Sequence, residues 1–415
     1  MIFKFLHAAD LHLDSPLLGL ANKSGDFAER VDEASRRAFD NLIELAIAED
    51  CRFVIFAGDI FDGDLRNMRT GLFFVSRVRR LTDAGIAVFM VLGNHDAEHA
   101  FIRKLDLGPR VEVFPAKKAQ TIELADVGVA LHGRSFPRAD LTDNIARDYP
   151  SPVSGLFNIG VLHTACEGRE GPHARYAPCS LEQLVNHGYQ YWALGHVHGT
   201  DVLNERPFIV YPGNLQGRHP RETGPKGAML VTVSDDEVVD LEHHALDTVR
   251  WASLEIDVAP ASAFSDVVAA LSAGLRTAFN EADGRALAVR LTLAGSSALS
   301  GELELRQHEL RDRAFEIAAS ISDDLWIERV RTAVTAPPAP PLLDHSVAGL
   351  IAEEIAAIGE DEIRARLDKT LAEVREKMPA GARADLLFER LRSEAPSQAR
   401  AIAAGLLATG TADAL

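Results

Sequence analysis

Side chains that can bind a metal ion or move a proton follow an apolar segment within the stretch VLGNHDAEH, residues 91–99. Residues 86–92 form a continuous apolar run, which is typical of a buried strand. Asn94, His95 and Asp96 come directly after it. An amide, an imidazole and a carboxylate at one strand end predict a chemical role for this turn.

The same arrangement recurs along the first half of the chain. Four other apolar runs end in Asp or His, in the segments Asp10-Leu11-His12, Gly58-Asp59, His163 and Gly195-His196-Val197-His198. Each motif alone is weak, because Asp-x-His and Gly-Asp also occur in ordinary turns. The carboxyl ends of strands are the ligand-binding edge of α/β sheets, so we expect the five segments to converge.

The converging groups would be oxygen and nitrogen ligands without a thiolate, which suits Mn, Fe or Zn. One tetrahedral ion cannot use them all. Two ions about 3.5–4 Å apart can hold a phosphate, activate a water and neutralise phosphoryl charge. The set therefore predicts phosphoester hydrolysis at a two-metal site built from Asp10, His12, Asp59, Asn94, His163, His196 and His198.

Up to about residue 245, the sequence pattern of the elements that must position these residues indicates an α/β structure. Helical periodicity at residues 27–49 and 66–82 separates the early strands, and later strands follow one another more closely, which favours mixed sheets. From Trp251 onward the pattern is that of a small α+β unit, followed by the proline-rich stretch APPAPPLLD. We predict domains at 1–248 and 249–335, a linker at 336–345 and a helical C-terminal region at 346–415.

Composition restricts the class of protein. A length of 415 residues suggests two or three domains. The net charge of −18 argues mildly against a freestanding nucleic-acid binder, although carboxylates that hold divalent cations also lower the charge. No apolar run approaches the roughly 18–20 residues of a membrane span, and the first residues do not resemble a signal peptide. Three cysteines without zinc-type spacing are consistent with a reducing cytoplasm, so we expect a cytoplasmic protein without a membrane partner.

The motif set resembles that of the calcineurin-like metallophosphoesterases. More narrowly, HAADLHLDSPL, FAGDIFD and YPGNLQGRHPRETGPKG resemble the SbcD/YhaO-type nucleases of DNA double-strand-break repair. The resemblance implies a four-layer α/β/β/α sandwich with mixed sheets, a small α+β capping domain and a helical C-terminal module. It also implies an Mn²⁺-dependent DNA exonuclease or endonuclease. Leu13-Asp14, where many SbcD-type proteins have Leu-Gly, agrees better with the YhaO-like branch.

The resemblance further implies roles for single residues. Asp10, His12, Asp59 and His198 would hold the first ion, and a bridging Asp59 with Asn94, His163 and His196 would hold the second. His95 would contact the scissile phosphate and protonate the leaving oxygen, as the family's catalytic histidine does. Asp96 would accept the other ring N–H of His95.

Partners are also implied by the resemblance. Relatives act on DNA with an SMC-like ATPase and dimerise, so we expect DNA ends, such an ATPase and a second copy of the chain as partners, in association with the nucleoid. Residues 346–407 are the candidate docking segment, and the alternative is a helical tail that packs on its own capping domain.

Other readings remain open. Arg218, His219 and Arg221, with Lys226, form a basic loop that can meet phosphates flanking the cleaved bond, or that is simply solvated. His7 either supports the site or belongs to the core. The main alternative function is a metallophosphodiesterase or phosphatase acting on a small nucleotide or other phosphoester. A third hypothesis is a scaffold protein that has the fold but no catalytic activity. The intact set of motifs argues against it.

Overall fold

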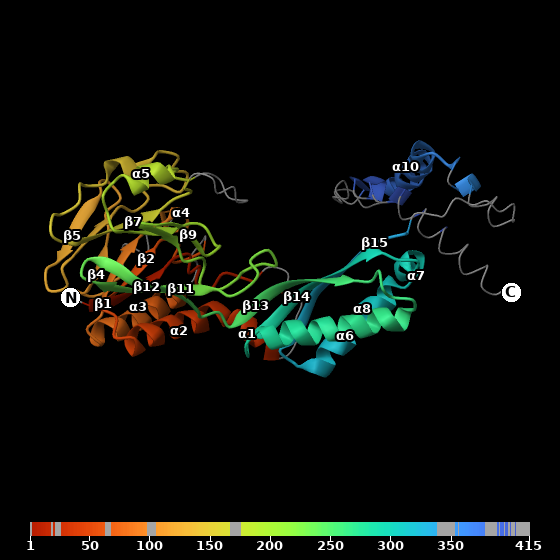
Figure 1. Ribbon diagram of the computed structural model, residues 1–415. Coiled ribbons are helices and arrows are strands. Elements are labelled where there is room, and N and C mark those ends of the chain that lie inside the picture. The colour runs from red at the N-terminus through yellow and green to blue at the C-terminus, as the bar shows by residue number, and fades with distance from the viewer. Residues whose placement is uncertain are drawn as a thin grey trace. The chain divides into compact units, whose positions relative to one another are not determined.

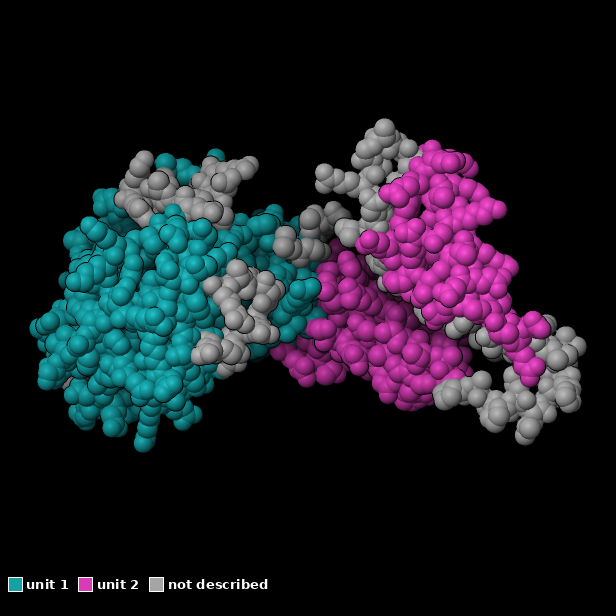
Figure 2. All heavy atoms as spheres, turned by 90° about the horizontal axis from the view of Figure 1, so that it is seen from above, with its two compact units in different colours: residues 1–252, 282–288 teal, residues 253–281, 289–415 magenta. Residues whose placement is uncertain are grey.

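The computed structural model describes residues 2–17, 20, 26–62, 68–97, 105–166 and 176–337, and parts of the segment from 353 to 403. The described chain divides into two compact units (Figure 2). The first comprises Met1–Ala252 and Ala282–Ala288, and the second comprises Ser253–Glu281 and Val289–Leu415. Among the described residues, no helix is both long enough and apolar enough to cross a membrane.

Two six-stranded mixed sheets form the first unit (Figure 1). The first sheet has the order β12 (Glu237–Ala245), β11 (Gly227–Ser234), β1 (Ile2–Ala8), β2 (Phe53–Ala57), β3 (Ala87–Val91) and β4 (Val111–Val113). The second has the order β5 (Gln120–Leu124), β6 (Val129–Gly133), β7 (Phe157–His163), β8 (Tyr191–Gly195), β10 (Phe208–Tyr211) and β9 (Asp201–Glu205). Strands β1 to β4 are parallel to one another, as are β6, β7, β8 and β10. Strand β11 pairs antiparallel with both β1 and β12, and the edge strands β5 and β9 pair antiparallel with β6 and β10.

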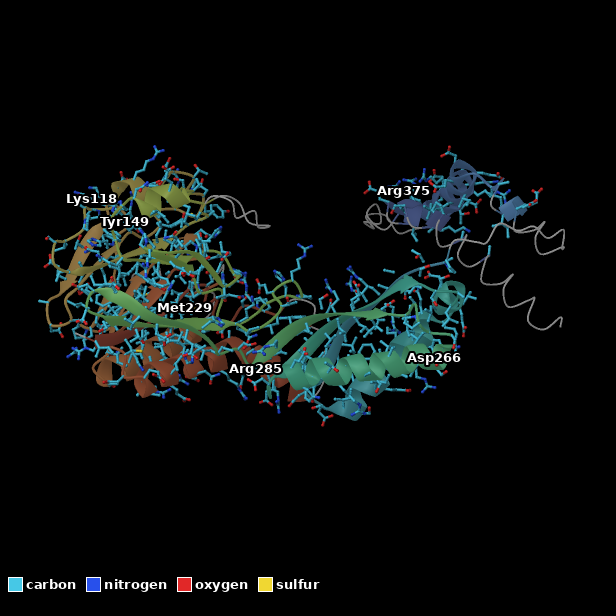
Figure 3. All side chains as sticks on the ribbon, in the orientation of Figure 1. Lys118, Tyr149, Met229, Asp266, Arg285 and Arg375 are labelled. Atoms are coloured by element: carbon cyan, nitrogen blue, oxygen red, sulfur yellow. The ribbon has the colours of Figure 1, made fainter. Side chains whose placement is uncertain are left out.

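Apolar side chains from both sheets fill the space between them. Phe5 and Phe53 of the first sheet stack with ring centroids 5.0 Å apart, and Tyr191 of the second sheet meets Phe5 edge-on at 5.3 Å. Met229 on β11 belongs to the same core (Figure 3). Because alternate residues of each strand face this core, the remaining ones must be covered by helices.

Helices cover the outer faces of both sheets. Buried residues of α2 (Ala34–Ala48) and α3 (Met68–Asp83) pack against the first sheet, and those of α5 (Leu181–Val185) pack against the second. The helices of this unit are α1 (Asp26–Asp32), α2 (Ala34–Ala48), α3 (Met68–Asp83), α4 (Asn94–Ala97) and α5 (Leu181–Val185), with a 3₁₀ turn at Ile145–Asp148. The four-layer α/β/β/α sandwich predicted from the sequence is therefore confirmed.

The second unit is a smaller α+β structure. Its sheet has the order β13 (Val249–Asp257), β14 (Ala286–Ser296) and β15 (Leu325–Thr335), and its helices are α6 (Phe264–Glu281), α7 (Ser300–Leu305) and α8 (Gln307–Ile321). Leu271 of α6, Leu291 of β14 and Leu310 of α8 share one buried core. Beyond it the structure describes α10 (Glu360–Glu376). Most of the predicted linker, from residue 338, lies outside the described residues.

Two local predictions differ from the structure. The helix predicted at residues 27–49 is two helices, α1 and α2, which a turn at Glu33 separates. The sequence prediction also omitted β11, which pairs antiparallel with β1, and the edge strands β9 and β12. In β12 many side chains are polar and only partly buried, so it carries little of the apolar signal on which strand prediction depends.

Candidate metal centre

The turns that follow β1 and β2 run side by side beyond the ends of the strands. The backbone N–H of Asp10 donates to the Gly58 carbonyl at 3.0 Å, and the N–H of His12 donates to the Asp59 carbonyl at 3.1 Å. These bonds extend the parallel pairing of the two strands. Backbone hydrogen bonds alone therefore fix the relative positions of three predicted ligands, Asp10, His12 and Asp59.

Four predicted ligands adopt left-handed backbone conformations. The φ angles are +51° at Asp10, +42° at His12, +53° at Asp59 and +100° at His196. Such a conformation is unfavourable for residues other than glycine, by about 1–3 kcal/mol each, and persists only where surrounding contacts impose it. Six other described non-glycine residues share this conformation, but only here does it occur at four residues of one predicted site.

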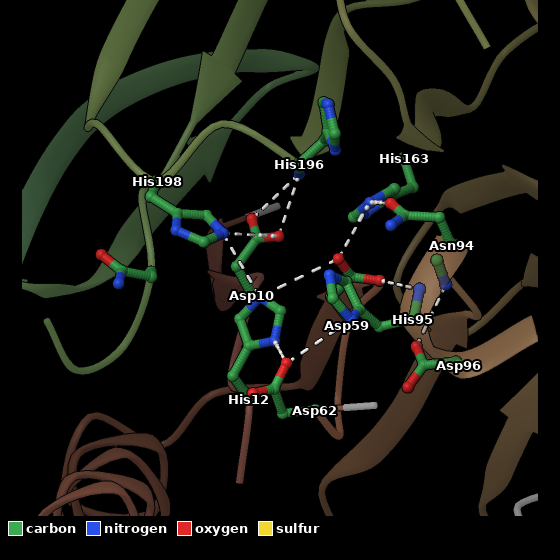
Figure 4. A network of polar contacts seen from close by, with 12 residues as sticks. Asp10, His12, Asp59, Asp62, Asn94, His95, Asp96, His163, His196 and His198 are labelled. Atoms are coloured by element: carbon green, nitrogen blue, oxygen red, sulfur yellow. Dashed lines mark hydrogen bonds and ion pairs between the residues drawn. The ribbon is translucent and has the colours of Figure 1, made fainter. Parts of the chain in front are cut away.

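Asp10, His12 and His198 form one cluster of close ligand atoms (Figure 4). The Nε2 atoms of His12 and His198 are 3.2 Å apart, and Nε2 of His198 lies 3.8 Å from Oδ1 of Asp10. Asp10 and His12 are almost completely buried. Burial raises the pKa of Asp10 and lowers the pKa of His12 to about 3. Two imidazoles and a carboxylate are thus held together, and Asp10 and His12 are shielded from solvent.

Asp59, His163 and Asn94 form a second cluster beside the first. Nε2 of His163 lies 3.4 Å from Oδ2 of Asp59 and 3.0 Å from Oδ1 of Asn94. Burial opposes protonation of His163, but the charge of Asp59 raises its pKa to about 9. Burial likewise opposes ionisation of Asp59, yet His163 and His12 hold its pKa well below the usual range. Without a cation, a proton on His163 compensates the carboxylate.

Lone pairs converge in both clusters, which is the arrangement that a cation requires. Nδ1 of His163 lies 2.9 Å from the Ala57 carbonyl oxygen, which only accepts, so Nδ1 carries the hydrogen of the neutral ring. Nε2 then directs a lone pair toward the Asp59 carboxylate. Nδ1 of His198 lies 2.6 Å from Oε1 of Glu222, so its Nε2 likewise faces His12 and Asp10. The residues fit a pair of divalent ions.

Both the backbone and the ring of His196 contact other predicted ligands. Its N–H donates to both carboxylate oxygens of Asp10, at 3.2 and 2.9 Å, and its ring lies edge-on to His163 with centroids 5.3 Å apart. Among the described residues, the groups of ligand atoms within 4.8 Å of one another do not include His196. Its role as a ligand stays a prediction.

His95 lies at the rim of the two clusters, and its side chain is 36% exposed. Its ring meets the ring of His12 edge-on at 4.9 Å, and its backbone N–H donates to Oδ1 of Asp59 at 3.0 Å. A partly exposed imidazole beside buried ligands can reach a substrate and still be positioned by the site.

Asp96 differs from its predicted role. Its carboxylate accepts the backbone N–H groups of Ile60, Phe61 and Gly93, at 3.0–3.1 Å. It therefore ties the turn after β2 to the turn after β3. The carboxylate beside the ring of His95 is Asp62, whose Oδ1 lies 3.4 Å from Nδ1 of His95. The adjacency of Asp96 in sequence misled the prediction, because the short helix α4 turns its side chain toward the backbone.

Several residues of the predicted basic loop do not present a free positive charge at the site, because they pair with carboxylates or are buried. Nη1 of Arg218 lies 3.2 Å from Oδ1 of Asp62, and His219 contacts Glu222 at 3.4 Å. The side chain of Arg221 is exposed. Lys226 is buried and donates to the His198 carbonyl at 3.0 Å, so it supports the backbone instead of presenting a surface charge.

Two carboxylates at the site were missed from the sequence. Asp62 follows Asp59 by three residues in the stretch FAGDIFD, and this spacing was a signal that could have found it. Glu222 lies 24 residues after His198, within the stretch YPGNLQGRHPRETGPKG, but its sequence position does not mark it as a partner of that imidazole. Only the folded loop brings it to the imidazole.

Comparison with known proteins gives two family matches. A model described as calcineurin-like phosphoesterase matches residues 3–200, and one described as the middle domain of metallophosphoesterase YhaO matches residues 251–335.

Single proteins are similar over longer stretches. The chain is 33% identical over 300 residues to the uncharacterized metallophosphoesterase YhaO of Bacillus subtilis, covering 71% of this chain and 72% of that protein. It is 23% identical over 281 residues to the DNA double-strand break repair protein Mre11 of Haloferax volcanii, covering 62% of this chain and 55% of that protein. A dimetal phosphatase from Danio rerio matches with a TM-score of 0.36 and 12% identity, over 56% of this chain and 93% of that chain.

Proposed function

The chain belongs to the YhaO family of calcineurin-like metallophosphoesterases, and from that membership we propose that it is an Mn²⁺-dependent nuclease that hydrolyses phosphodiester bonds in DNA. Hydrolysis of phosphoester bonds follows from the family. The choice of DNA is supported by the similarity to proteins named as DNA double-strand break repair protein Mre11.

One observation carries the proposal. Two clusters of buried oxygen and nitrogen ligands lie side by side at the strand ends, and the partly exposed His95 lies next to both. When bound, a pair of divalent ions at such ligands supplies neutralising charge to a phosphate and makes a water more acidic. The absence of thiolates suits manganese, which we propose as the metal.

The residues around the clusters divide the remaining work. His95 donates the proton that the leaving oxygen needs, since its ring is close to the ligands and reachable from solvent. Asp62 holds both His95 and the guanidinium of Arg218. We propose that Arg218 and His219 approach the phosphate that flanks the cleaved bond, whereas Arg221 contacts it further out.

The function is tested with end-labelled linear DNA and purified full-length protein. We expect Mn²⁺-dependent shortening of the DNA that a chelator abolishes and that added Mn²⁺ restores. If the DNA stays intact while a cyclic nucleotide or another small phosphodiester is hydrolysed rapidly, the nuclease proposal is wrong and the small-molecule alternative holds.

A His95→Asn variant tests the proposed acid. We expect it to bind Mn²⁺ as the unmodified protein does and to lose hydrolysis by about 100- to 10,000-fold, the usual contribution of general acid catalysis. Elemental analysis after dialysis measures the metal. Loss of metal from this variant would assign His95 as a ligand and remove its role as the acid.

We also propose that residues 346–415 dock an SMC-like ATPase and that the chain dimerises. Within the described part of this region, α10 carries internal ion pairs such as Arg364–Glu360 and exposes Val374, which is consistent with a surface helix. A pull-down with the cognate ATPase, with and without residues 346–415, tests the docking. Unchanged capture after truncation contradicts it, and light scattering of the purified chain tests the dimer.

A further inference from the structure

Glu222 is buried behind His198, on the side of the imidazole that faces away from the other ligands. Its Oε1 lies 2.6 Å from Nδ1 of His198 and 3.4 Å from Nε2 of His219. Its Oε2 accepts from Nδ2 of Asn214 at 2.9 Å and from the backbone N–H of Arg218 at 2.6 Å. Both oxygens are therefore engaged, and the carboxylate has one orientation.

The donors on Oε2 are fixed. The backbone N–H of Arg218 can only donate. The amide of Asn214 has its NH₂ group on this side, because the same Nδ2 also lies 2.9 Å from the carbonyl oxygen of Gln216, which only accepts. Glu222 thus receives two hydrogens on one oxygen and turns the other oxygen to His198.

From this geometry we infer that Glu222 is a positioning residue that fixes the tautomer of His198 and so presents Nε2 to the metal centre. A carboxylate that only accepts requires the hydrogen of the neutral ring to be on Nδ1. Nε2 is then free of hydrogen and faces His12 and Asp10. The inference rests on the metal-dependent function proposed above, and the same loop also holds the His198 carbonyl through Lys226.

His163 is also held through its Nδ1 atom, but its hydrogen-bond partner is weaker than a carboxylate. Nδ1 of His163 meets the carbonyl of Ala57, which is neutral and belongs to a strand, so no single side-chain replacement can reverse it. At His198 the tautomer depends on one side chain. Glu222→Gln is therefore a sharp test of the tautomer, since it keeps the size of the side chain, removes its charge and replaces one acceptor oxygen by a donor NH₂ group.

In Glu222→Gln the amide oxygen must face Asn214 and Arg218, because both are donors. The amide NH₂ then faces Nδ1 of His198, which has to accept, and the ring hydrogen moves to Nε2. The variant would place a hydrogen on the atom that a metal ion needs. We expect Mn²⁺ affinity to fall by about 10- to 100-fold, the usual effect of changing the hydrogen-bond partner of a ligating histidine.

The first measurement needs no metal. Proton–nitrogen correlation spectra of metal-free protein with ¹⁵N-labelled histidine, recorded at alkaline pH, report the tautomer of each neutral ring, and a His198→Gln variant assigns the signal. We expect His198 to carry its hydrogen on Nδ1 in the unmodified protein and on Nε2 in Glu222→Gln. An unchanged tautomer overturns the inference, whatever the activity.

The second measurement is Mn²⁺ binding by titration calorimetry. Glu242→Gln is the matched control, because the exposed Glu242 lies 3.2 Å from Nε2 of His244 on β12, a histidine outside the predicted ligand set. We expect the control to bind like the unmodified protein. Equal Mn²⁺ affinity for Glu222→Gln and the control overturns the inference and leaves the proposed function unaffected. If the unmodified protein binds no Mn²⁺, the proposed function is wrong, and the tautomer measurement alone decides whether Glu222 fixes the His198 ring.

Discussion

Asp62 connects three groups that have different proposed tasks. Its Oδ1 lies 3.4 Å from Nδ1 of His12, 3.4 Å from Nδ1 of His95 and 3.2 Å from Nη1 of Arg218. Its Oδ2 accepts from the hydroxyl of Ser15 at 2.8 Å. One carboxylate thus touches a metal ligand, the proposed acid and the proposed phosphate contact.

Replacement of Asp62 by Asn is predicted to lower the rate of hydrolysis more than the stability of the fold. The amide keeps the size but loses the charge that holds two imidazoles and a guanidinium, so we expect kcat to fall by at least about 10-fold. The side chain is partly exposed, and the melting temperature should change little. Steady-state kinetics and a thermal melt check this, and an unchanged kcat would show that Asp62 does not position His95.

At the scale of elements, the ends of β2 and β3 approach closely at Gly93. A Cβ atom at this position would lie 2.2 Å from Oδ1 of Asp59 and 2.8 Å from its backbone nitrogen. The glycine is needed for space, since its φ angle is not in the left-handed range. The predicted bridging carboxylate can keep its place only while residue 93 has no side chain.

Gly93→Ala is accordingly predicted to displace Asp59 and to abolish tight Mn²⁺ binding. Oδ1 of Asp59 is fixed by the N–H of His95, so the carboxylate cannot move without breaking that bond. Gly199→Ala is the control, because the turn there leaves open space for a Cβ atom. Calorimetric titration of both variants measures the effect, and equal binding would contradict the prediction.

His7 joins the two sheets through buried hydrogen bonds. Nδ1 lies 3.0 Å from the Tyr191 hydroxyl and Nε2 lies 3.0 Å from the Leu194 carbonyl oxygen. Of the two roles considered from the sequence, the structure places it in the core, where it touches strand β8. Burial lowers the pKa of His7 from 6.5 to about 3.

The pH dependence of stability follows from this shift. Below pH 6.5 the unfolded chain binds a proton at His7 that the folded protein does not, so the free energy of unfolding decreases as pH falls from about 6.5 towards about 3. The slope from this group approaches about 1.4 kcal/mol per pH unit. Denaturant unfolding with chelator present, compared with His7→Gln, isolates the contribution. Parallel profiles for the two proteins would refute it.

For the molecule as a whole, all predicted ligands belong to the first compact unit. Mn²⁺ that binds only the folded form stabilises it, by about 2.7 kcal/mol at a free concentration 100 times Kd. We therefore expect added Mn²⁺ to raise the melting temperature of the first unit, and chelator to reverse this, while unfolding of the second unit is unchanged. Calorimetry with Asp59→Asn as control checks it, and an equal shift in that variant would mean that the ions bind elsewhere.

Sequence alone predicted the fold and the neighbourhood of the site for a physical reason. Asp10 and Asp59 come two residues after β1 and β2, and His163 is the last residue of β7. Parallel strands bring their carboxyl ends together whatever the details of the loops. The contacts of Asp96, Asp62 and Glu222 depend on which way a side chain turns in an irregular segment. That direction is set by backbone hydrogen bonds and packing between distant residues, which no local pattern records.

The left-handed backbone at Asp10, His12, Asp59 and His196 also governs how this protein can change by mutation. Apart from glycine, asparagine and aspartate tolerate that conformation best, and β-branched residues tolerate it worst. A change from Asp to Asn keeps the turn and removes the charge, whereas a change to Val or Ile damages the fold as well. Descendants of this chain that lose catalysis but still fold would therefore arise most readily through Asp→Asn replacements, and such a replacement at position 10 or 59 is a marker by which an inactive relative could be recognised.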